Sequence, residues 1–320
     1  MTLLALATQS WAQQLPEVAL KDHATAFATT PSPETENYNF KIGNMTTDLV
    51  GAFSMEYNDN INETTTGSIS DMILRFGIRS KSVLPLTELN SLTLNINADY
   101  RFYLDHSELN SNKNFLDINP GSELAFKWWI KNMEFKLYDQ LQYNVTSTDT
   151  RVFNTNTSTV TGGNTSLGQL MNRAGLEGMW DFNDLKIYGG YSRDDVRADR
   201  FAFRALDRTA HNVYLSPLFL VHPDFSVGIM SSYTWNNYRY DFQNDSTAWA
   251  LGPTFYWQAS PNLNAALNVY WKSINSDTNG TSGDTSDTSK LNGSFRITHE
   301  MNSLFNHSIE IARTTDFGTV

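Results

Sequence analysis

The side chains with the clearest chemical potential in this sequence are charged residues at alternate positions of extended segments. Side chains of a β-strand point alternately to its two faces, so charges with this spacing would share one face. Rows of charge beside a water-filled passage create a transverse field and give mild ion selectivity. The alternative is that the charges satisfy one another and only keep that face hydrated. The expected lining residues are Arg75, Arg79, Asp99, Arg101, Lys127, Lys136, Arg173 and Glu177.

Later segments place neutral polar residues on the corresponding face. We therefore expect an interior that is charged on one side and neutral on the other. The neutral set includes Asn212, Tyr214, Ser216, Ser232, Thr254, Tyr256, Asn264, Asn268 and Tyr270.

Other motifs are weaker candidates for chemistry. Asp105-His106-Ser107 offers the residue types of a catalytic triad, but neighbours at a strand end rarely converge on one substrate atom. The loop Asp277–Asp287 could offer oxygen ligands to Ca²⁺, yet it lacks the spacing and terminal Glu of a dedicated calcium loop. Arg193–Arg208 could line an external mouth or fold inward as a constriction, although an ordinary loop is the expected reading. We therefore expect neither an enzyme nor a cofactor.

The segment that best indicates how these residues are positioned is Ser91–Tyr103. It alternates between an apolar and a polar face over a length that suits a strand crossing a bilayer, which needs about 9–11 residues. Its apolar face ends in Tyr100 and Phe102, where a membrane strand places aromatic residues at the lipid boundary.

Twelve further segments repeat this alternation, which makes thirteen predicted strands. Their approximate ranges are 46–58, 71–80, 122–130, 133–143, 170–180, 185–191, 213–219, 225–235, 249–257, 263–271, 291–297 and 309–311.

The connections between these segments alternate between short turns and long polar loops. Short turns on one side and long loops on the other are typical of an outer-membrane barrel. Pro217 and Pro253 fall inside predicted strands, where a missing N–H breaks a ladder bond. We expect bulges or later strand starts there. The expected long loops are 58–70, 104–121, 144–169, 192–208, 236–246 and 273–289.

Composition limits the class of protein. The chain has 320 residues, no cysteine and 23 basic against 34 acidic side chains, for a net charge of −11. This charge argues against nucleic-acid binding, which needs a basic surface. No window approaches the roughly 18 consecutive apolar residues of a transmembrane helix.

The sequence predicts three regions. Residues 1–12 resemble the end of an export signal, with Ser10 and Ala12 before a possible cleavage point. Residues 13–38 lack periodicity and are expected to form a flexible periplasmic leader. Residues 39–320 are expected to form an antiparallel up-and-down transmembrane β-barrel. Thirteen strands are an odd number, so we expect closing strands to be missing from the C-terminus and a native count of 14 or 16.

The alternating strands, the aromatic strand ends, Glu56–Asn62 after the first strand and Ser246-Thr247 through Leu251-Gly252-Pro253 resemble porin-like outer-membrane β-barrels of Gram-negative bacteria. The resemblance covers roughly residues 40–320. It implies a multi-pass protein of the cell outer membrane and a passive channel for small polar solutes or ions. It further implies contact with outer-membrane lipid and lipopolysaccharide, handling by the barrel-assembly machinery, and possible homo-oligomers.

Two alternatives remain. The barrel could be only the membrane anchor of a structural or adhesive surface protein whose polar loops contact a partner. The chain could also be a soluble secreted β-sandwich or lectin, in which case the apolar residues would be buried between two sheets.

Overall fold

The computed structural model describes residues 38–61, 68–110, 116–154, 159–199, 201–280, 287–302 and 305–315. The expected signal remnant at 1–12, and the leader except for residue 38, lie outside the described residues.

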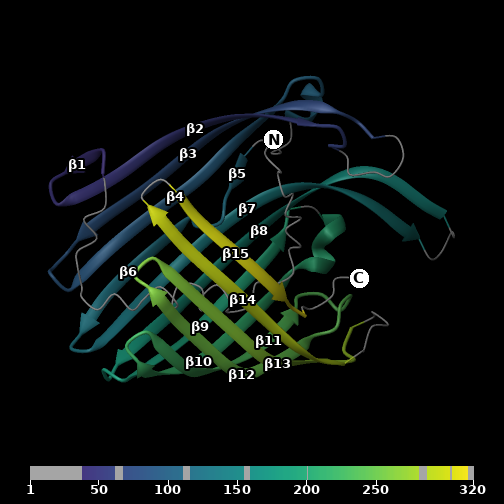
Figure 1. Ribbon diagram of the computed structural model, residues 1–320. Coiled ribbons are helices and arrows are strands. Elements are labelled where there is room, and N and C mark those ends of the chain that lie inside the picture. The colour runs from purple at the N-terminus through teal and green to yellow at the C-terminus, as the bar shows by residue number, and fades with distance from the viewer. Residues whose placement is uncertain are drawn as a thin grey trace.

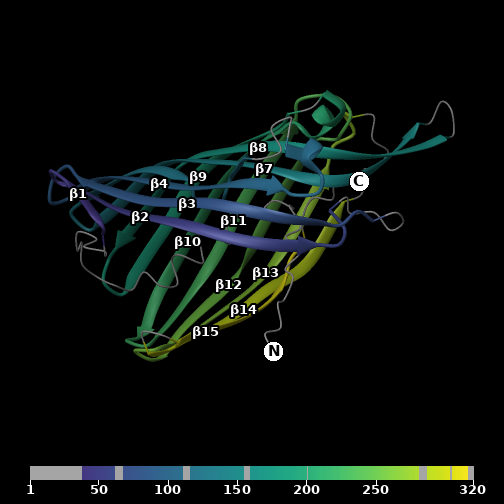
Figure 2. The same cartoon turned by 90° about the horizontal axis from the view of Figure 1, so that it is seen from above.

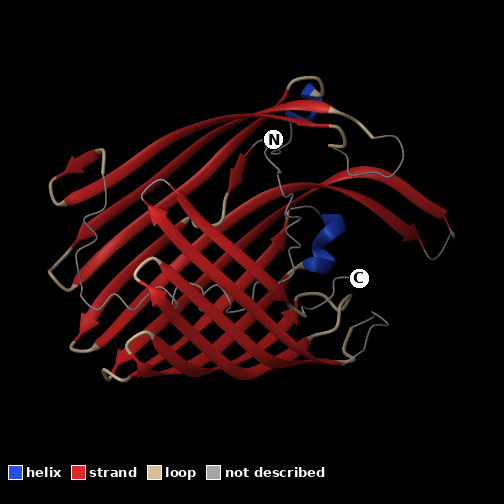
Figure 3. Cartoon of the chain, viewed as in Figure 1, coloured by secondary structure: helices blue, strands red, loops and turns tan. Residues whose placement is uncertain are grey.

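The described chain forms one antiparallel sheet of fifteen strands with two short 3₁₀ segments (Figures 1 and 3). Within the described ranges, no helix is long and apolar enough to cross a membrane. The strands are β1 (Phe40–Ile42), β2 (Met45–Asn58), β3 (Asp71–Pro85), β4 (Asn90–Tyr103), β5 (Leu116–Ile118), β6 (Glu123–Ile130), β7 (Met133–Asn154), β8 (Thr159–Asp181), β9 (Leu185–Ala198), β10 (Arg208–His222), β11 (Phe225–Tyr238), β12 (Ser246–Ser260), β13 (Leu263–Ser276), β14 (Thr288–Asn302) and β15 (Phe305–Arg313); the 3₁₀ segments are η1 (Ser107–Asn110) and η2 (Phe201–Leu206).

Apart from β5 and β6, each strand pairs with its neighbours in sequence, so the topology is up-and-down. The strands occupy fourteen positions, because β5 and β6 share the one between β4 and β7. The short turns lie together on the left of Figure 1 and the long connections on the right. Figure 2 shows that the sheet curls strongly around an interior. Within the described residues the outer edges of β1 and β15 are not paired with each other.

The all-β, antiparallel prediction is confirmed, and all thirteen predicted segments are strands. The strand number was wrong, because β1 and β5 have only three residues each and are too short to show alternation. The loop limits at 144–169 and 192–208 were also wrong. There β7, β8 and β9 continue well beyond the predicted ends, because ladder hydrogen bonds extend strands whose sequence is polar on both faces.

The break between β5 and β6 is a bulge. Ala98 faces Ile118 and Asn95 faces Glu123, so residues 119–122 lie opposite only two residues of β4. Gly121 adopts a φ of +95°, which favours glycine. The Ser122 hydroxyl both accepts from the Asn97 amide at 3.0 Å and donates to the Asn97 carbonyl at 3.1 Å, which satisfies that part of the β4 backbone.

The two faces of the sheet differ in the way the sequence predicts. The apolar parity is exposed along strand after strand, while side chains of the opposite parity are often buried. Nothing in the described chain forms a second layer, so this difference follows from curvature: the buried parity lies on the concave, inner face. The exposed outer set includes Phe53, Met55, Phe76, Ile78, Leu94, Ile96, Leu124, Leu137, Leu176, Leu215, Ile229, Leu251, Leu291 and Ile309, and the buried inner set includes Ile73, Ala125, Tyr138, Tyr188, Val196, Tyr214, Met230, Ala250, Tyr256 and Tyr270.

Glycines let inner tyrosines lie flat against the sheet. A Cβ at Gly175 would be 2.6 Å from the Tyr138 ring, and one at Gly190 would be 2.7 Å from the Tyr214 ring. Each ring therefore covers the backbone of a neighbouring strand instead of extending into the interior.

Pro217 and Pro253 do not cause bulges, contrary to our expectation, and neither begins a strand. The β10–β11 pairing passes from Leu215↔Ser231 to Leu218↔Gly228 without a change of register, and the β12–β13 pairing passes in the same way from Leu251↔Trp271 to Thr254↔Asn268. Each proline thus interrupts the ladder on one side for two residues and leaves the alignment intact.

Gly252 lies in the second of these interruptions, where two backbones come close together. A Cβ at Gly252 would be 2.1 Å from the Val269 carbonyl oxygen and 2.4 Å from Tyr270 Cα. Only glycine fits this approach of β12 to β13 without displacing backbone atoms.

Candidate functional site

The charged part of the inner face begins with a group of ion pairs across β2, β3, β4 and β5. Arg75 Nη2 lies 2.9 Å from Glu56 Oε2, and Arg75 Nη1 lies 3.9 Å from Asp117 Oδ2. Arg101 pairs with the other oxygen of Asp117, whose side chain is only 5% exposed. Two predicted basic residues are therefore brought together by one buried carboxylate.

Asp99 belongs to the same region through the bulge between β5 and β6. The Asn119 side-chain amide donates to Asp99 Oδ2 at 2.6 Å. Gly77 lies opposite Asp99 in register, and a Cβ at Gly77 would be 2.4 Å from Asp99 Oδ1. The glycine leaves room for this carboxylate on the inner face.

A second charged group connects β6 and β7. Glu123 Oε2 accepts from Lys136 Nζ at 2.8 Å and from Gln140 Nε2 at 2.7 Å. The Lys136 ammonium also lies 4.8 Å from the centre of the Tyr138 ring, within the range of a cation–π contact. Lys136 lies between Lys127 and Glu177 in register.

The third group runs from β8 to β11. The Arg173 guanidinium makes two hydrogen bonds to Asp194, from Nε to Oδ1 at 2.6 Å and from Nη2 to Oδ2 at 2.8 Å. Asn212 donates to Asp194 Oδ2 at 3.3 Å, and Thr234 donates to Asn212 Oδ1 at 2.6 Å. This network joins the charged side of the inner face to the neutral side.

The side expected to be neutral continues across β12, β13 and β14, but it is not wholly neutral, because Lys272 and the Arg296–Glu310 ion pair also lie on the inner parity. The Thr254 hydroxyl donates to Asn268 Oδ1 at 2.5 Å, and the Asn268 amide donates to Ser294 Oγ at 3.1 Å. Near the end of the described chain, Lys272 Nζ donates to the Thr315 carbonyl, and the Thr315 hydroxyl donates to Asn292 Oδ1 at 2.9 Å. The backbone after β15 therefore bends over the inner faces of β13 and β14.

All eight residues expected to line the interior lie on the inner parity. Arg75, Arg101, Lys136 and Arg173 hold ion pairs with carboxylates. Arg79 is exposed and makes no ion pair among the described residues. Four of the eight residues are thus paired with carboxylates, and Arg79 is exposed; their role in lining a passage stays a prediction.

Sequence analysis missed two of the acidic partners. Asp117 lies in the three-residue strand β5, and Asp194 lies in a range we assigned to a loop. The signal for Asp194 was present, because it continues the parity of Tyr188 and Gly190 along β9.

The Asp105-His106-Ser107 motif follows the end of β4 and contacts Asp71 at the start of β3. The His106 ring nitrogen Nδ1 lies 3.0 Å from Asp71 Oδ2. Asp71 also accepts from the backbone amides of Leu104, Asp105 and His106 at 2.9–3.1 Å, and its side chain is 0% exposed. Asp71 therefore fixes the start of the loop after β4.

Replacing Asp71 with alanine should lower the free energy of unfolding by about 2 to 3 kcal/mol, because three amides and His106 lose a buried charged acceptor. The free energy of unfolding of Asp71→Asn should lie between that of the alanine variant and that of the parent, since asparagine keeps one acceptor oxygen. Urea unfolding in detergent micelles, followed by tryptophan fluorescence, measures both. Asp184→Ala, in an exposed short turn, is the control and should change stability by less than about 0.5 kcal/mol; an equal loss there would contradict the assignment.

The described residues contain no group of three or more His, Cys, Asp or Glu side chains placed to hold a metal ion. Part of the expected calcium loop, residues 281–286, lies outside the described residues. The range Arg193–Arg208 is also not one loop: it contains the end of β9, the 3₁₀ segment η2 and the first residue of β10.

No family model matches this chain, and no curated protein matches it. Among solved structures, the chain is similar to a loop L8 deletion mutant of OmpT, described as an outer membrane protein of Vibrio cholerae, at 8% identity over 85% of this chain and 96% of that chain, with a TM-score of 0.42. It is also similar to Salmonella typhi OmpF in complex with daunomycin, at 11% identity over 86% and 92% of the two chains, with a TM-score of 0.40. The OmpT structure expressed in the outer membrane matches at 9% identity over 86% and 99%, with a TM-score of 0.34. The similarity concerns the fold.

Proposed function

We propose that this chain is a multi-pass β-barrel of the Gram-negative outer membrane and acts as a passive, porin-like diffusion channel for small polar solutes or ions. The observation that carries the proposal is the contrast between the two faces of the curled sheet. Its outer face exposes apolar side chains, and its inner face holds hydrogen-bonded polar and charged ones.

The outer face has the features of a surface in contact with lipid. Most strands have 14 or 15 residues, more than the roughly 9–11 that a tilted strand needs to cross a bilayer. Aromatic residues occur towards both ends. Tyr191, Tyr233 and Trp249 lie in one register row towards the long connections, and Trp180 contacts Phe182 beside a short turn. Such girdles mark the two lipid–water boundaries of outer-membrane barrels.

The number of strand positions supports an interior wide enough for solutes. About eight strands enclose a space that side chains just fill, whereas this sheet has fourteen positions. β1 runs towards the short turns and β15 away from them, so pairing of these two edges would be antiparallel like every other pair in the sheet. An even number of strands is the rule for bacterial single-chain barrels.

The charge distribution supports small polar solutes or ions as the transported class. Most of the inner face of β10 to β14 carries neutral amides and hydroxyls, with charged exceptions at Arg208, Lys272, Lys290 and Arg296, whereas ion-paired charges are frequent on the inner face of β2 to β9. An asymmetric wall of this kind places a field across the passage without blocking it. The net charge of −11 argues against nucleic acid as cargo. We propose no catalytic role.

Conductance of the purified full-length chain in planar bilayers tests the proposal. Discrete current steps are expected. If the chain floats with vesicles but shows no conductance, a barrel that serves only as an anchor is favoured. If the chain does not associate with vesicles, the membrane assignment is overturned.

Reversing inner charge should change ion selectivity. Arg79→Glu combined with Lys127→Glu should shift the permeability ratio towards cations by about two- to fivefold, because the inner face loses two positive charges and gains two negative ones. Reversal potentials in a salt gradient measure the shift. Lys41→Glu with Lys131→Glu makes the same change in net charge at the short-turn end and should move the ratio much less; an equal effect would contradict the assignment of the lining residues.

A further inference from the structure

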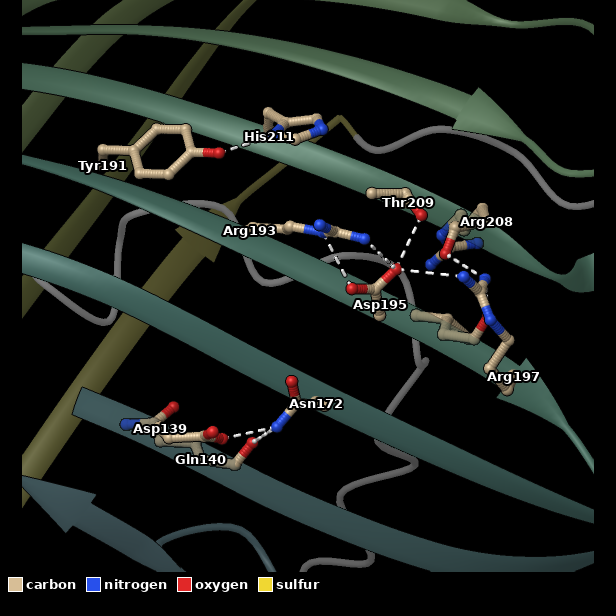
Figure 4. A network of polar contacts seen from close by, with 11 residues as sticks. Asp139, Gln140, Asn172, Tyr191, Arg193, Asp195, Arg197, Arg208, Thr209 and His211 are labelled. Carbon is tan, nitrogen blue, oxygen red and sulfur yellow. Dashed lines mark hydrogen bonds and ion pairs between the residues drawn. The ribbon is translucent and has the colours of Figure 1, made fainter.

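Charged and polar residues occupy the outer face of β9 and β10 where the apolar pattern ends, beside the Asp139–Asn172 pair of β7 and β8 (Figure 4). We call Arg193, Asp195, Arg197, Thr209 and His211 the outer polar cluster. Arg193 faces His211 and Asp195 faces Thr209 in register. All five share the parity of exposed Tyr191 and Val213, so they lie on the outer face.

One carboxylate organises the cluster. Asp195 accepts from Arg193 Nε at 2.9 Å, from Arg197 Nη2 at 3.0 Å and from the Thr209 hydroxyl at 2.7 Å. Two guanidinium groups therefore share one negative charge, which leaves the trio with a formal charge of +1. The Arg193 side chain is 52% exposed and that of Arg197 is 32% exposed, whereas Asp195 is 23% exposed. The carboxylate is the least exposed group, so the positive charge faces the surroundings.

The cluster lies just beyond an aromatic row. Tyr191, Val213 and Tyr233 form one register row, and the cluster begins two residues further towards the long connections. His211 lies between the aromatic row and the cluster. Its Nδ1 shares a hydrogen bond of 2.7 Å with the Tyr191 hydroxyl, and its ring stacks on Trp235 with the ring centres 5.1 Å apart.

We propose that the outer polar cluster binds the phosphate of an anionic lipid headgroup in the leaflet facing the long connections; this inference rests on the proposed membrane location. Arginine pairs with phosphate through parallel N–H donors, and phosphate complements the net positive charge of the trio. Asp195 holds both guanidiniums in place before binding, which reduces the side-chain entropy lost on contact.

The position of the cluster selects a lipid over a free phosphate ion. The side chains next to it on the same face, towards the short turns, are apolar and exposed: Leu176, Val213 and Leu215. Acyl chains attached to the phosphate would lie along these residues. The headgroup would then meet the arginines above the aromatic row, which is where the hydrocarbon region ends.

The test measures binding of bisphosphorylated lipid A to the full-length chain in detergent micelles, by native mass spectrometry. Arg193→Gln with Arg197→Gln should reduce retained lipid A about tenfold, and dephosphorylated lipid A should bind the parent chain as weakly as bisphosphorylated lipid A binds the variant. Lys41→Gln with Lys131→Gln removes the same charge at the opposite end and should retain lipid A like the parent.

Other outcomes overturn the inference. Equal retention by the parent and the arginine variant would do so, as would a variant that changes the oligomeric mass with no change in lipid binding, which would assign the cluster to contact with a second copy of the chain. Flotation with vesicles distinguishes a failure of the lipid-binding inference from a failure of the proposed membrane location. A parent chain that floats but does not distinguish the two lipids leaves the membrane proposal standing, and one that does not float removes both.

Discussion

Alanine at Gly252 should lower the free energy of unfolding by about 3 kcal/mol, near the upper end of the usual cost of forcing extra volume into a packed site. The added methyl would meet the Val269 carbonyl at 2.1 Å and Tyr270 Cα at 2.4 Å. Both are backbone atoms, so no side-chain rotation relieves the contact. Either β12 and β13 separate or the strand shifts its alignment.

The control for this change is Gly51→Ala in β2, where a Cβ would have no atom within 4 Å. Alanine there should be neutral or stabilise by up to about 1 kcal/mol, because glycine in a strand loses more conformational freedom on folding. Unfolding by urea in micelles, together with the mobility of unheated samples in gels, measures both variants. Equal stability of the two would show that the approach at Gly252 does not constrain folding.

Replacing Arg173 with methionine should cost about 3 kcal/mol of stability. The change removes both hydrogen bonds to Asp194 and leaves a largely buried carboxylate without its cation. Breaking one partner of a buried pair typically costs about 3–5 kcal/mol, and partial solvent contact of the Arg173 side chain reduces the estimate to the lower end.

A second substitution separates charge from packing. Adding Asp194→Asn to Arg173→Met removes the unpaired charge while keeping an acceptor for Asn212, so the double variant should recover about half of the lost stability. The same urea titration measures it. A double variant less stable than Arg173→Met alone would show that the pair does not act as a coupled unit.

The strands were predictable because one physical constraint repeats along the chain. Wherever one face is apolar and the other is polar, residues alternate with period two, and Ser91–Tyr103 shows this over its full length. The apolar alternation is lost in the sequence of residues 144–169 and 192–198, where polar residues dominate both parities, although the ladders of β7, β8 and β9 continue there.

The inner site was predictable as a set of positions but not as a set of pairs. Parity alone placed Arg75, Arg101 and Arg173 on the inner face. Their partners depend on cross-strand register, which is fixed by turns and by the four-residue bulge before Glu123. The bulge shifts the register by two residues, so Asp117 lies opposite Asp99 and reaches Arg101 diagonally across the strands.

The two prolines also define where this sheet can loosen. Ile229 faces Pro253 and Met230 faces Gly252 across the intact β11–β12 ladder, while the ladders to β10 and to β13 are both interrupted at that level. The two ladders that join the β11–β12 hairpin to β10 and to β13 therefore lack hydrogen-bonded pairs at the same level of the sheet. Amide hydrogen exchange should be fastest there among the described mid-strand positions, and in the proposed membrane location thinning of the bilayer should bend the wall along this line first.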